Sequence, residues 1–357
     1  MDVLKVFRTR GKHLAWKRLD DDQVTGPAGE NIVAEEAYLV LRLTEVYLAC
    51  SRKLWRKYYP VVHAWEGMTA GEEHGMTSPS RLQLGESNLD RVVTLNARLI
   101  GPTPYRGGDV AIVAALYSVP GDDAAQALTE TVSLLAAFSG TAVPAYEIAT
   151  LVTTSIDRVL GLSETALRLG LCDTFYANNP LRSGFHVGIG ADTTSVDFAR
   201  LWLRDGHLLQ GADPNVARPF TGHDYLVVEL ERQEIRDDWP GLPGITDFQS
   251  QFAAIMKIPG DIATKKAVLH NLWPRFTEAL ETSPHLTRTN ARFIAANVAK
   301  DLEARLQALE TGNPFETKSW SGEDSKLDPR EIDFTDIPDY VTMSDISRGD
   351  PAAIMPW

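Results

Sequence analysis

Hydrophobic and polar side chains alternate along several stretches of the first two-thirds of the chain. The alternation is clear at 38–46 (YLVLRLTEV), 92–100 (VVTLNARLI) and 224–232 (DYLVVELER). Successive side chains of a β-strand point to opposite faces, so this period of two predicts strands with one buried face. The segment 110–119 (VAIVAALYSV) is hydrophobic throughout. It therefore predicts a strand that is covered on both faces.

Two short polar segments mark turns between predicted strands. Asp205-Gly206 lies in the middle of 197–211 (DFARLWLRDGHLLQG), and a dipeptide of this type predicts a tight β-hairpin. Residues 104–109 (PYRGGD) separate two hydrophobic runs. Glycine-rich loops that hold phosphate usually lead into a helix, whereas a β-branched hydrophobic run follows here. We therefore interpret 104–109 as a corner between two strands.

Helical patterns occupy two other regions. The segment 122–161 predicts a helical hairpin inserted between strands, with Asp123 as a capping residue. From 246 to 312 the pattern is helical again, and Asp261 is a predicted N-cap. In the last of these helices one face carries hydrophobic side chains and Gly312 follows as a stop signal. That face comprises Phe293, Ile294, Val298, Leu302, Leu306 and Leu309.

Together these patterns predict an α+β fold with an antiparallel, β-sandwich-like body. Residues 35–68 (EEAYLVLRLTEVYLACSRKLWRKYYPVVHAWEGM) resemble the first strands of a C2-type β-sandwich, in which a basic loop separates two hydrophobic strands. The calcium-binding aspartate clusters of that family have no counterpart here, so the resemblance implies a fold and no site residues. The predicted organisation is a basic N-terminal segment (1–29), a β-rich body (30–240) containing the helical hairpin (122–161), a helical segment (246–312) and an acidic arm (313–357).

Composition narrows the class of function. The chain has 357 residues, 44% hydrophobic and 23% charged, with a formal net charge of −13. An acidic chain of this kind disfavours nucleic acid as the main partner, because such binding depends on basic patches. We find no secretory signal, no hydrophobic run long enough to span a membrane and no cofactor motif, and there are only two cysteines. These features predict a cytoplasmic protein without a cofactor.

The acidic arm combines charge with aromatic side chains. Residues 313–357 hold ten acidic and four basic side chains, a net charge of −6. A fully disordered tail is usually poor in aromatic residues. We therefore predict that the arm packs on its own chain or on a partner. Its predicted anchors are Trp320, Phe334, Tyr340 and Trp357.

A basic and aromatic segment stands out within this acidic chain. Residues 51–60 (SRKLWRKYYP) contain Arg52, Lys53, Trp55, Arg56 and Lys57. Such a segment could contact anionic lipid headgroups, an acidic partner protein or the acidic arm of the same chain. A solvated loop with scattered charges is the alternative, because runs of charge often serve only solubility.

A second segment contains possible metal ligands. His63, Glu66 and His74 lie in 63–74 (HAWEGMTAGEEH), and their side chains are ligand types for zinc and similar ions. The spacing is not that of the H-E-x-x-H motif, and a solvated, glycine-containing loop is the alternative. Neither Cys50 nor Cys172 shows the context of a catalytic cysteine.

The leading functional interpretation is a non-enzymatic protein–protein interaction module: a scaffold, adaptor or regulatory subunit that uses the basic loop and the C-terminal arm. One alternative is an effector or peripheral membrane protein that its own tail inhibits until proteolysis or partner binding releases it. Another alternative is a metal-dependent hydrolase that uses the 63–74 loop.

Overall fold

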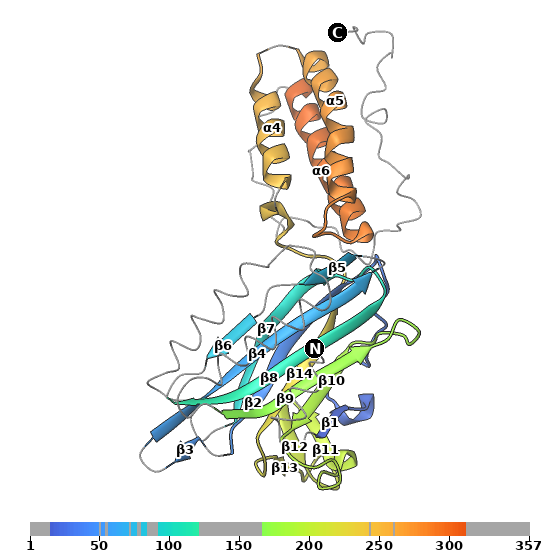
Figure 1. The fold of residues 1–357 in the computed structure, drawn as a ribbon. Coiled ribbons are helices and arrows are strands. Elements are labelled where there is room, and N and C mark those ends of the chain that lie inside the picture. The colour runs from blue at the N-terminus through green and yellow to red at the C-terminus, as the bar shows by residue number, and fades with distance from the viewer. Residues whose placement is uncertain are drawn as a thin grey trace. The chain divides into compact units, whose positions relative to one another are not determined.

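The computed structural model describes residues 15–49, 51–53, 56–70, 73–76, 80–83, 92–120, 166–242, 244–259 and 261–311. The chain divides into two compact units: Met1–Ala34 with Tyr38–Arg232, and Glu35–Ala37 with Gln233–Trp357. The first unit carries the β-sheets and the second carries three α-helices (Figure 1). The predicted α+β class with antiparallel sheets is therefore confirmed. The helical hairpin predicted at 122–161 lies outside the described residues.

A five-stranded sheet forms one layer of the first unit, in the strand order β1-β10-β14-β2-β7. Strand β10 is antiparallel to both β1 and β14, and β2 is antiparallel to β7. The strands of this sheet are β1 (Ala15–Arg18), β10 (Gly184–Ile189), β14 (Tyr225–Gln233), β2 (Tyr38–Tyr47) and β7 (Val93–Pro104).

A six-stranded sheet is built around the long strand β4 (Arg56–Ala70), in the order β3-β4-β8-β9 with β5 and β6 also paired to β4. Its strands β4, β8 and β9 run side by side and are antiparallel (Figure 1). The other members are β3 (Arg52–Lys53), β5 (Glu73–Met76), β6 (Ser80–Gln83), β8 (Asp109–Pro120) and β9 (Ala166–Phe175).

A small three-stranded sheet packs on one face of the five-stranded sheet. It consists of β11 (Leu201–Arg204), β12 (His207–Gln210) and β13 (Arg218–Pro219). The turn between β11 and β12 is the predicted Asp205-Gly206 hairpin, in which both residues have positive φ angles. A shared hydrophobic core fills the space between the two sheets. It includes Val187, Leu203, Leu208, Phe220, Tyr225 and Val227.

The other face of the five-stranded sheet contacts strand β9. The indole Nε1 of Trp16 donates to Asp173 Oδ2 at 2.8 Å, and Arg168 pairs with Asp224 at 3.0 Å. Gly188 lies close to this contact, where an added Cβ would be 3.2 Å from Trp16 Cε3 and 3.4 Å from Leu169 Cδ2. Layers therefore cover both faces of the five-stranded sheet. This explains why strand β2 is buried along almost its whole length.

The observed burial of strands β2, β7 and β8 agrees only in part with the burial that the sequence pattern predicts. The expectation of one buried face is wrong for β2, which packs on both faces, but holds for β7, where Val93 and Leu99 are buried and Thr94, Asn96 and Arg98 are exposed. Strand β8 is buried almost throughout, as its continuous hydrophobic run predicts.

Residues 105–108 form the predicted corner, which carries the chain from β7 in the five-stranded sheet to β8 in the six-stranded sheet. The Tyr105 hydroxyl donates to the Gly108 carbonyl at 3.2 Å, and Gly107 and Gly108 have positive φ angles. The hydrogen bond and the glycine conformations are those of a structural turn.

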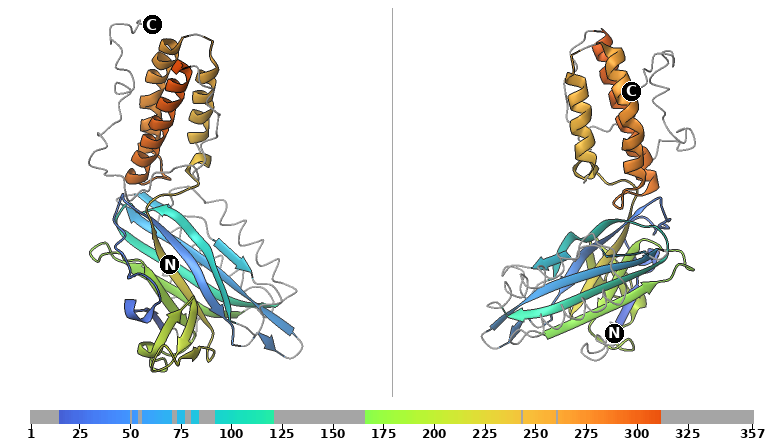
Figure 2. Two further views of the ribbon diagram at one scale, coloured as in Figure 1. Left: turned by 180° about the vertical axis from the view of Figure 1, so that it is seen from behind. Right: turned by 45° about the horizontal axis from the view of Figure 1, so that its top comes forward.

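The second unit contains α4 (Ile245–Lys257), α5 (Ile262–Glu281) and α6 (Arg288–Thr311), preceded by the short 3-10 helix η4 (Trp239–Gly241). The three helices run alongside one another (Figure 2). Phe276 is fully buried, and its ring contacts Phe248, Phe252 and Trp273 at centroid distances of 5.3, 5.4 and 5.5 Å. Close packing of aromatic rings stabilises such a core through burial and favourable ring geometry.

Two sequence predictions about these helices have different outcomes. Asp261 is the N-cap of α5, and its side chain accepts a hydrogen bond from the Thr264 backbone N–H at 2.9 Å. On α6 the predicted hydrophobic face is buried from Phe293 to Leu306, but Leu309 is 45% exposed. The prediction is wrong for Leu309, which lies in the last turn, beside the surface ion pair of Glu310 with Lys266.

A buried lysine side chain caps the carboxyl end of α4. Lys265 of α5 is 7% exposed, and its Nζ donates to the carbonyl oxygens of Met256 at 2.7 Å and Ile258 at 2.8 Å. The last carbonyl groups of a helix have no partner within the helix, so a cation at this place satisfies them and favours the negative end of the helix dipole.

Replacing Lys265 with methionine should lower the free energy of unfolding by about 2 kcal/mol, because two carbonyl groups at the end of α4 lose a charged donor. The matched control is the neighbouring Lys266→Met, which removes only the surface pair with Glu310 and should cost less than about 1 kcal/mol. Urea denaturation followed by helical circular dichroism measures both. Equal effects of the two substitutions would contradict the structural role of Lys265.

Candidate functional site

The basic segment at 51–60 is a β-hairpin and not the predicted loop. Strands β3 and β4 pair in antiparallel fashion, and this register sets Arg52 opposite Lys57 and Lys53 opposite Arg56. Trp55 lies outside the described residues. The hairpin is anchored at its base, where Ser51 and Tyr58 are buried and the Tyr58 N–H donates to the Ser51 carbonyl at 2.8 Å.

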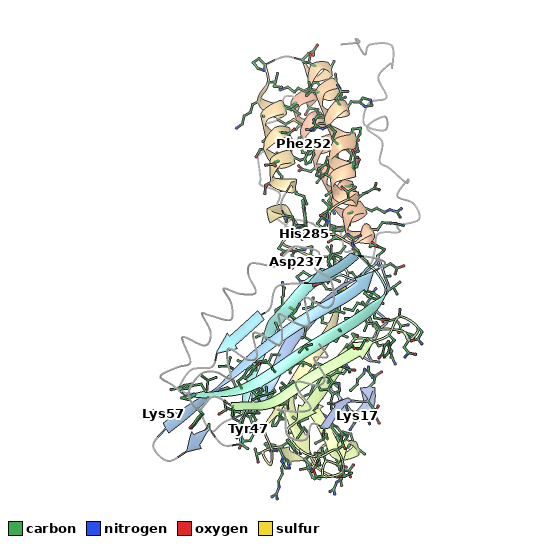
Figure 3. All side chains as sticks on the ribbon, viewed as in Figure 1. Lys17, Tyr47, Lys57, Asp237, Phe252 and His285 are labelled. Carbon is green, nitrogen blue, oxygen red and sulfur yellow. The ribbon has the colours of Figure 1, made fainter. Side chains whose placement is uncertain are left out.

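This hairpin lies where the long strand β4 begins, and Figure 3 labels Lys57 at that end of the sheet. The pairing of β4 with β8 starts at Tyr58 and Pro120, so Arg56 and Lys57 extend beyond it. Two pairs of like charges directly opposite each other are unfavourable in an antiparallel ladder.

The possible metal ligands lie on strands rather than in a loop. His63 and Glu66 are part of β4, and His74 is part of β5. Glu66 is 1% exposed, and its Oε2 accepts a hydrogen bond from the Thr103 hydroxyl at 3.2 Å. Within the part of the chain that the structure describes, no three His, Cys, Asp or Glu side chains are close enough together to hold a metal ion.

The anchors predicted on the acidic arm, Trp320, Phe334, Tyr340 and Trp357, all lie outside the described residues. Cys50 lies outside them too.

His186 is a core residue. Its ring stacks on Trp16 at a centroid distance of 5.2 Å and meets the edge of Phe175 at 5.7 Å. The side chain is 3% exposed. Burial lowers the pKa of His186 to about 4, although the nearby charge of Asp173 acts in the opposite direction. This histidine is therefore neutral at physiological pH.

The structure also reveals a buried carboxylate that the sequence reading missed. Glu45 on β2 is fully buried, and each of its oxygens lies in a polar environment. Oε1 accepts from the Tyr225 hydroxyl at 2.6 Å and from the Leu208 backbone N–H at 2.9 Å. Oε2 lies 3.0 Å from His207 Nδ1 and 3.3 Å from Thr94 Oγ1. We call Glu45, Thr94, His207 and Tyr225 the Glu45 cluster.

Hydrogen-bond chemistry assigns the protons of the Glu45 cluster. A carboxylate that receives a hydroxyl and a backbone N–H on one oxygen is an acceptor in its ionised form. Burial and then the negative charge of Glu45 raise the pKa of Tyr225, so this hydroxyl keeps its proton and donates it. The His207 Nδ1 then carries a hydrogen toward Glu45, because the facing oxygen is an acceptor.

One sequence signal could have identified this cluster. Glu45 follows Leu39, Leu41 and Leu43 at the same alternate positions of 38–46, so it stands where the pattern places a buried side chain. An acidic residue on a hydrophobic face must find donors, because burying an unpaired charge is costly. The partners come from β7, β12 and β14, far away in the sequence, so their identity was not predictable from the pattern.

No protein-family model matches the chain, and no curated protein matches it in sequence. Among the described helices, none has the length and hydrophobicity needed to cross a membrane.

The stability of the first unit should depend on the protonation of His186. In the unfolded chain His186 takes up a proton near its ordinary pKa of 6.5, whereas in the folded protein it does so only near pH 4. As pH falls from 6.5 to 4, the unfolded state therefore binds more protons and the free energy of unfolding falls. The loss should be of the order of 3 kcal/mol.

The variant His186→Phe keeps an aromatic ring at this position and should lack this acid-side loss. The control Trp16→Phe removes the stacking indole but keeps the imidazole, so it should retain the loss. Urea denaturation at several pH values between 4 and 7 measures the difference. Parallel pH profiles for wild type and His186→Phe would show that His186 does not cause the loss.

Removing the Tyr225 hydroxyl should destabilise the Glu45 cluster. The substitution Tyr225→Phe leaves the buried Oε1 of Glu45 with the Leu208 N–H as its remaining donor. We expect a loss of about 2 kcal/mol in the free energy of unfolding. Tyr176→Phe is the matched control, because Tyr176 is 58% exposed, and thermal denaturation should separate the two variants. Indistinguishable unfolding temperatures would refute the contribution of this hydrogen bond.

Proposed function

We propose that this chain is a non-enzymatic protein–protein interaction module, acting in the cytoplasm as a scaffold, adaptor or regulatory subunit. Its contact surface is the β3–β4 hairpin, and its partner is an acidic protein segment. The observation that carries the proposal is the register of the hairpin, in which Arg52 stands opposite Lys57 and Lys53 opposite Arg56.

An acidic partner suits this register for an electrostatic reason. Like charges at facing positions of a strand pair are unfavourable in general, and the carboxylates of an acidic segment would be attracted to basic residues that the register brings to facing positions. The buried Ser51 and Tyr58 hold the base of the hairpin. A binding surface whose base is held in place loses less entropy on binding than a free segment does.

The acidic arm of the same chain is one candidate for this acidic segment. Residues 313–357 carry a net charge of −6 and the proposed anchors Trp320, Phe334, Tyr340 and Trp357. In this proposal the arm contacts the hairpin in the same molecule or in a second copy, and an external acidic partner competes with it.

In this proposal the body behind the hairpin is sandwich-like, as the resemblance to C2-type domains implies. Two contacts between the layers support it. The Trp16 indole donates to Asp173 between β1 and β9, and Thr103 of β7 donates to the buried Glu66 of β4. Paired layers of this kind give the hairpin a rigid base.

Two other functions are alternatives to this interaction module, and the structure supports both less well. Peripheral membrane contact by a tail-inhibited effector would use the same basic residues together with Trp55. It is less well supported, because Tyr58, one of the aromatic residues of the segment, is only 7% exposed and so is not a surface residue. A metal-dependent hydrolase would need His63, Glu66 and His74 to converge, and Glu66 is already engaged by Thr103.

Charge reversal tests the leading proposal. The double variant Arg52→Glu/Lys57→Glu should bind a labelled peptide of residues 313–357 at least about tenfold more weakly than wild type. The binding should also weaken as salt is raised, because exposed charges are screened. Fluorescence anisotropy measures both effects, on the full chain and on a chain that ends at residue 312, where the arm cannot compete.

The matched control is Lys257→Glu/Lys300→Glu, which makes the same change in net charge at two exposed positions of α4 and α6. Equal affinities of the two double variants would end the proposal. Binding to phosphatidylserine vesicles but not to the peptide would favour the membrane alternative. Stoichiometric metal that is lost in His63→Ala and His74→Ala would favour the hydrolase.

A further inference from the structure

His207 presents one edge of its imidazole to solvent and hides the other. The side chain is 56% exposed, while the Glu45 side chain that it contacts is 0% exposed. Because Nδ1 faces the buried Glu45, the exposed part of the ring is the opposite edge, which carries Nε2. The Asp205-Gly206 turn that precedes His207 lies close to β7, since an added Cβ at Gly206 would be 3.1 Å from Thr94 Cγ2.

The hydrogen bonds select one tautomer of this ring. Glu45 Oε2 and Thr94 Oγ1 lie 3.0 and 3.1 Å from Nδ1, and the ionised carboxylate cannot donate. Nδ1 therefore carries the hydrogen, and the solvent-facing Nε2 carries the lone pair. A carboxylate that accepts the Nδ1 hydrogen also fixes the orientation of the ring, as the third group does when it orients a catalytic base.

We propose that His207 is a nucleophilic site that accepts acyl groups from small activated donors such as anhydrides and activated esters, with Glu45 as its positioning partner. Nε2 attacks the carbonyl carbon and forms an N–C bond. The C–O bond to the leaving group breaks, and the leaving group departs with the electron pair. The Nδ1 proton moves to Glu45 Oε2, so the ring ends as a neutral acyl-imidazole.

Charge favours an acyl group over a phosphoryl group at this position. A phosphoryl group would add negative charge close to the Glu45 carboxylate and next to Asp205 in the turn. Transfer of a neutral acyl group adds none. The exposed edge of the ring also gives a small donor direct access from solvent.

Two other histidines of the same unit serve as internal references. His186 is enclosed between Trp16 and Phe175 and is 3% exposed. His223 is exposed and stacks on Phe220 at a centroid distance of 6.2 Å. The proposal therefore predicts that an acyl donor reacts faster with His207 than with His223, although both side chains are accessible.

The test is the rate of acylation of the full chain by diethylpyrocarbonate, followed for each histidine by mass spectrometry of peptides. His207 should react at least about tenfold faster than His223, and Glu45→Gln should slow His207 by a similar factor. His223→Gln should leave the His207 rate unchanged. Equal rates at His207 and His223, or an unchanged His207 rate in Glu45→Gln, would overturn the proposal.

A second measurement needs no substitution at Glu45 and so does not depend on how that variant folds. The nitrogen chemical shifts of His207 in the wild-type chain report which ring nitrogen carries the hydrogen. We expect the Nδ1–H form. Observation of the Nε2–H form would remove the exposed lone pair and with it the proposed reaction.

Discussion

Burial of the Glu45 carboxylate is the constraint on which the first unit depends. A charge with no access to water must be compensated by several donors, or it costs far more than a typical core residue contributes. Here the donors come from Tyr225 on β14, Leu208 and His207 on β12, and Thr94 on β7. The carboxylate thereby couples β2 to both of its neighbours in the five-stranded sheet, β14 and the edge strand β7, and to the covering three-stranded sheet.

The same constraint bears on the position of the β11–β12 hairpin, whose Asp-Gly turn follows from its two-residue loop. The β11–β12 hairpin must present both the Leu208 N–H and the His207 ring to one carboxylate, so its turn is held close to Thr94. Asp205 and Gly206 adopt positive φ angles there, a conformation that asparagine, aspartate and glycine accept most readily. The same dipeptide thus serves the turn geometry and the compensation of a buried charge.

The sequence predicts those features that depend on neighbouring residues. The continuous hydrophobic run of β8, the Asp205-Gly206 turn and the Asp261 cap follow from local periodicity and turn chemistry, and all three are present. Features that depend on distant segments were missed. Strand β2 reads as half-buried because its Arg42 and Thr44 are polar, but layers on both faces of its sheet cover it. The donors of Glu45 are between 49 and 180 positions away in the chain, and no local pattern can identify them.

The first unit contains two charged features that differ in how their charge is compensated: the buried Glu45 cluster and the basic β3–β4 hairpin. Around Glu45 every donor is supplied from within the unit, so this charge is a permanent part of the fold and needs no outside molecule. In the β3–β4 hairpin the register instead pairs residues of like charge, Arg52 with Lys57 and Lys53 with Arg56. Like charges directly opposite each other in a strand pair are unfavourable in general. Within the proposed function this pairing has a use, because an acidic segment gains more from a concentrated pair of cations than from the same charges spread over a surface.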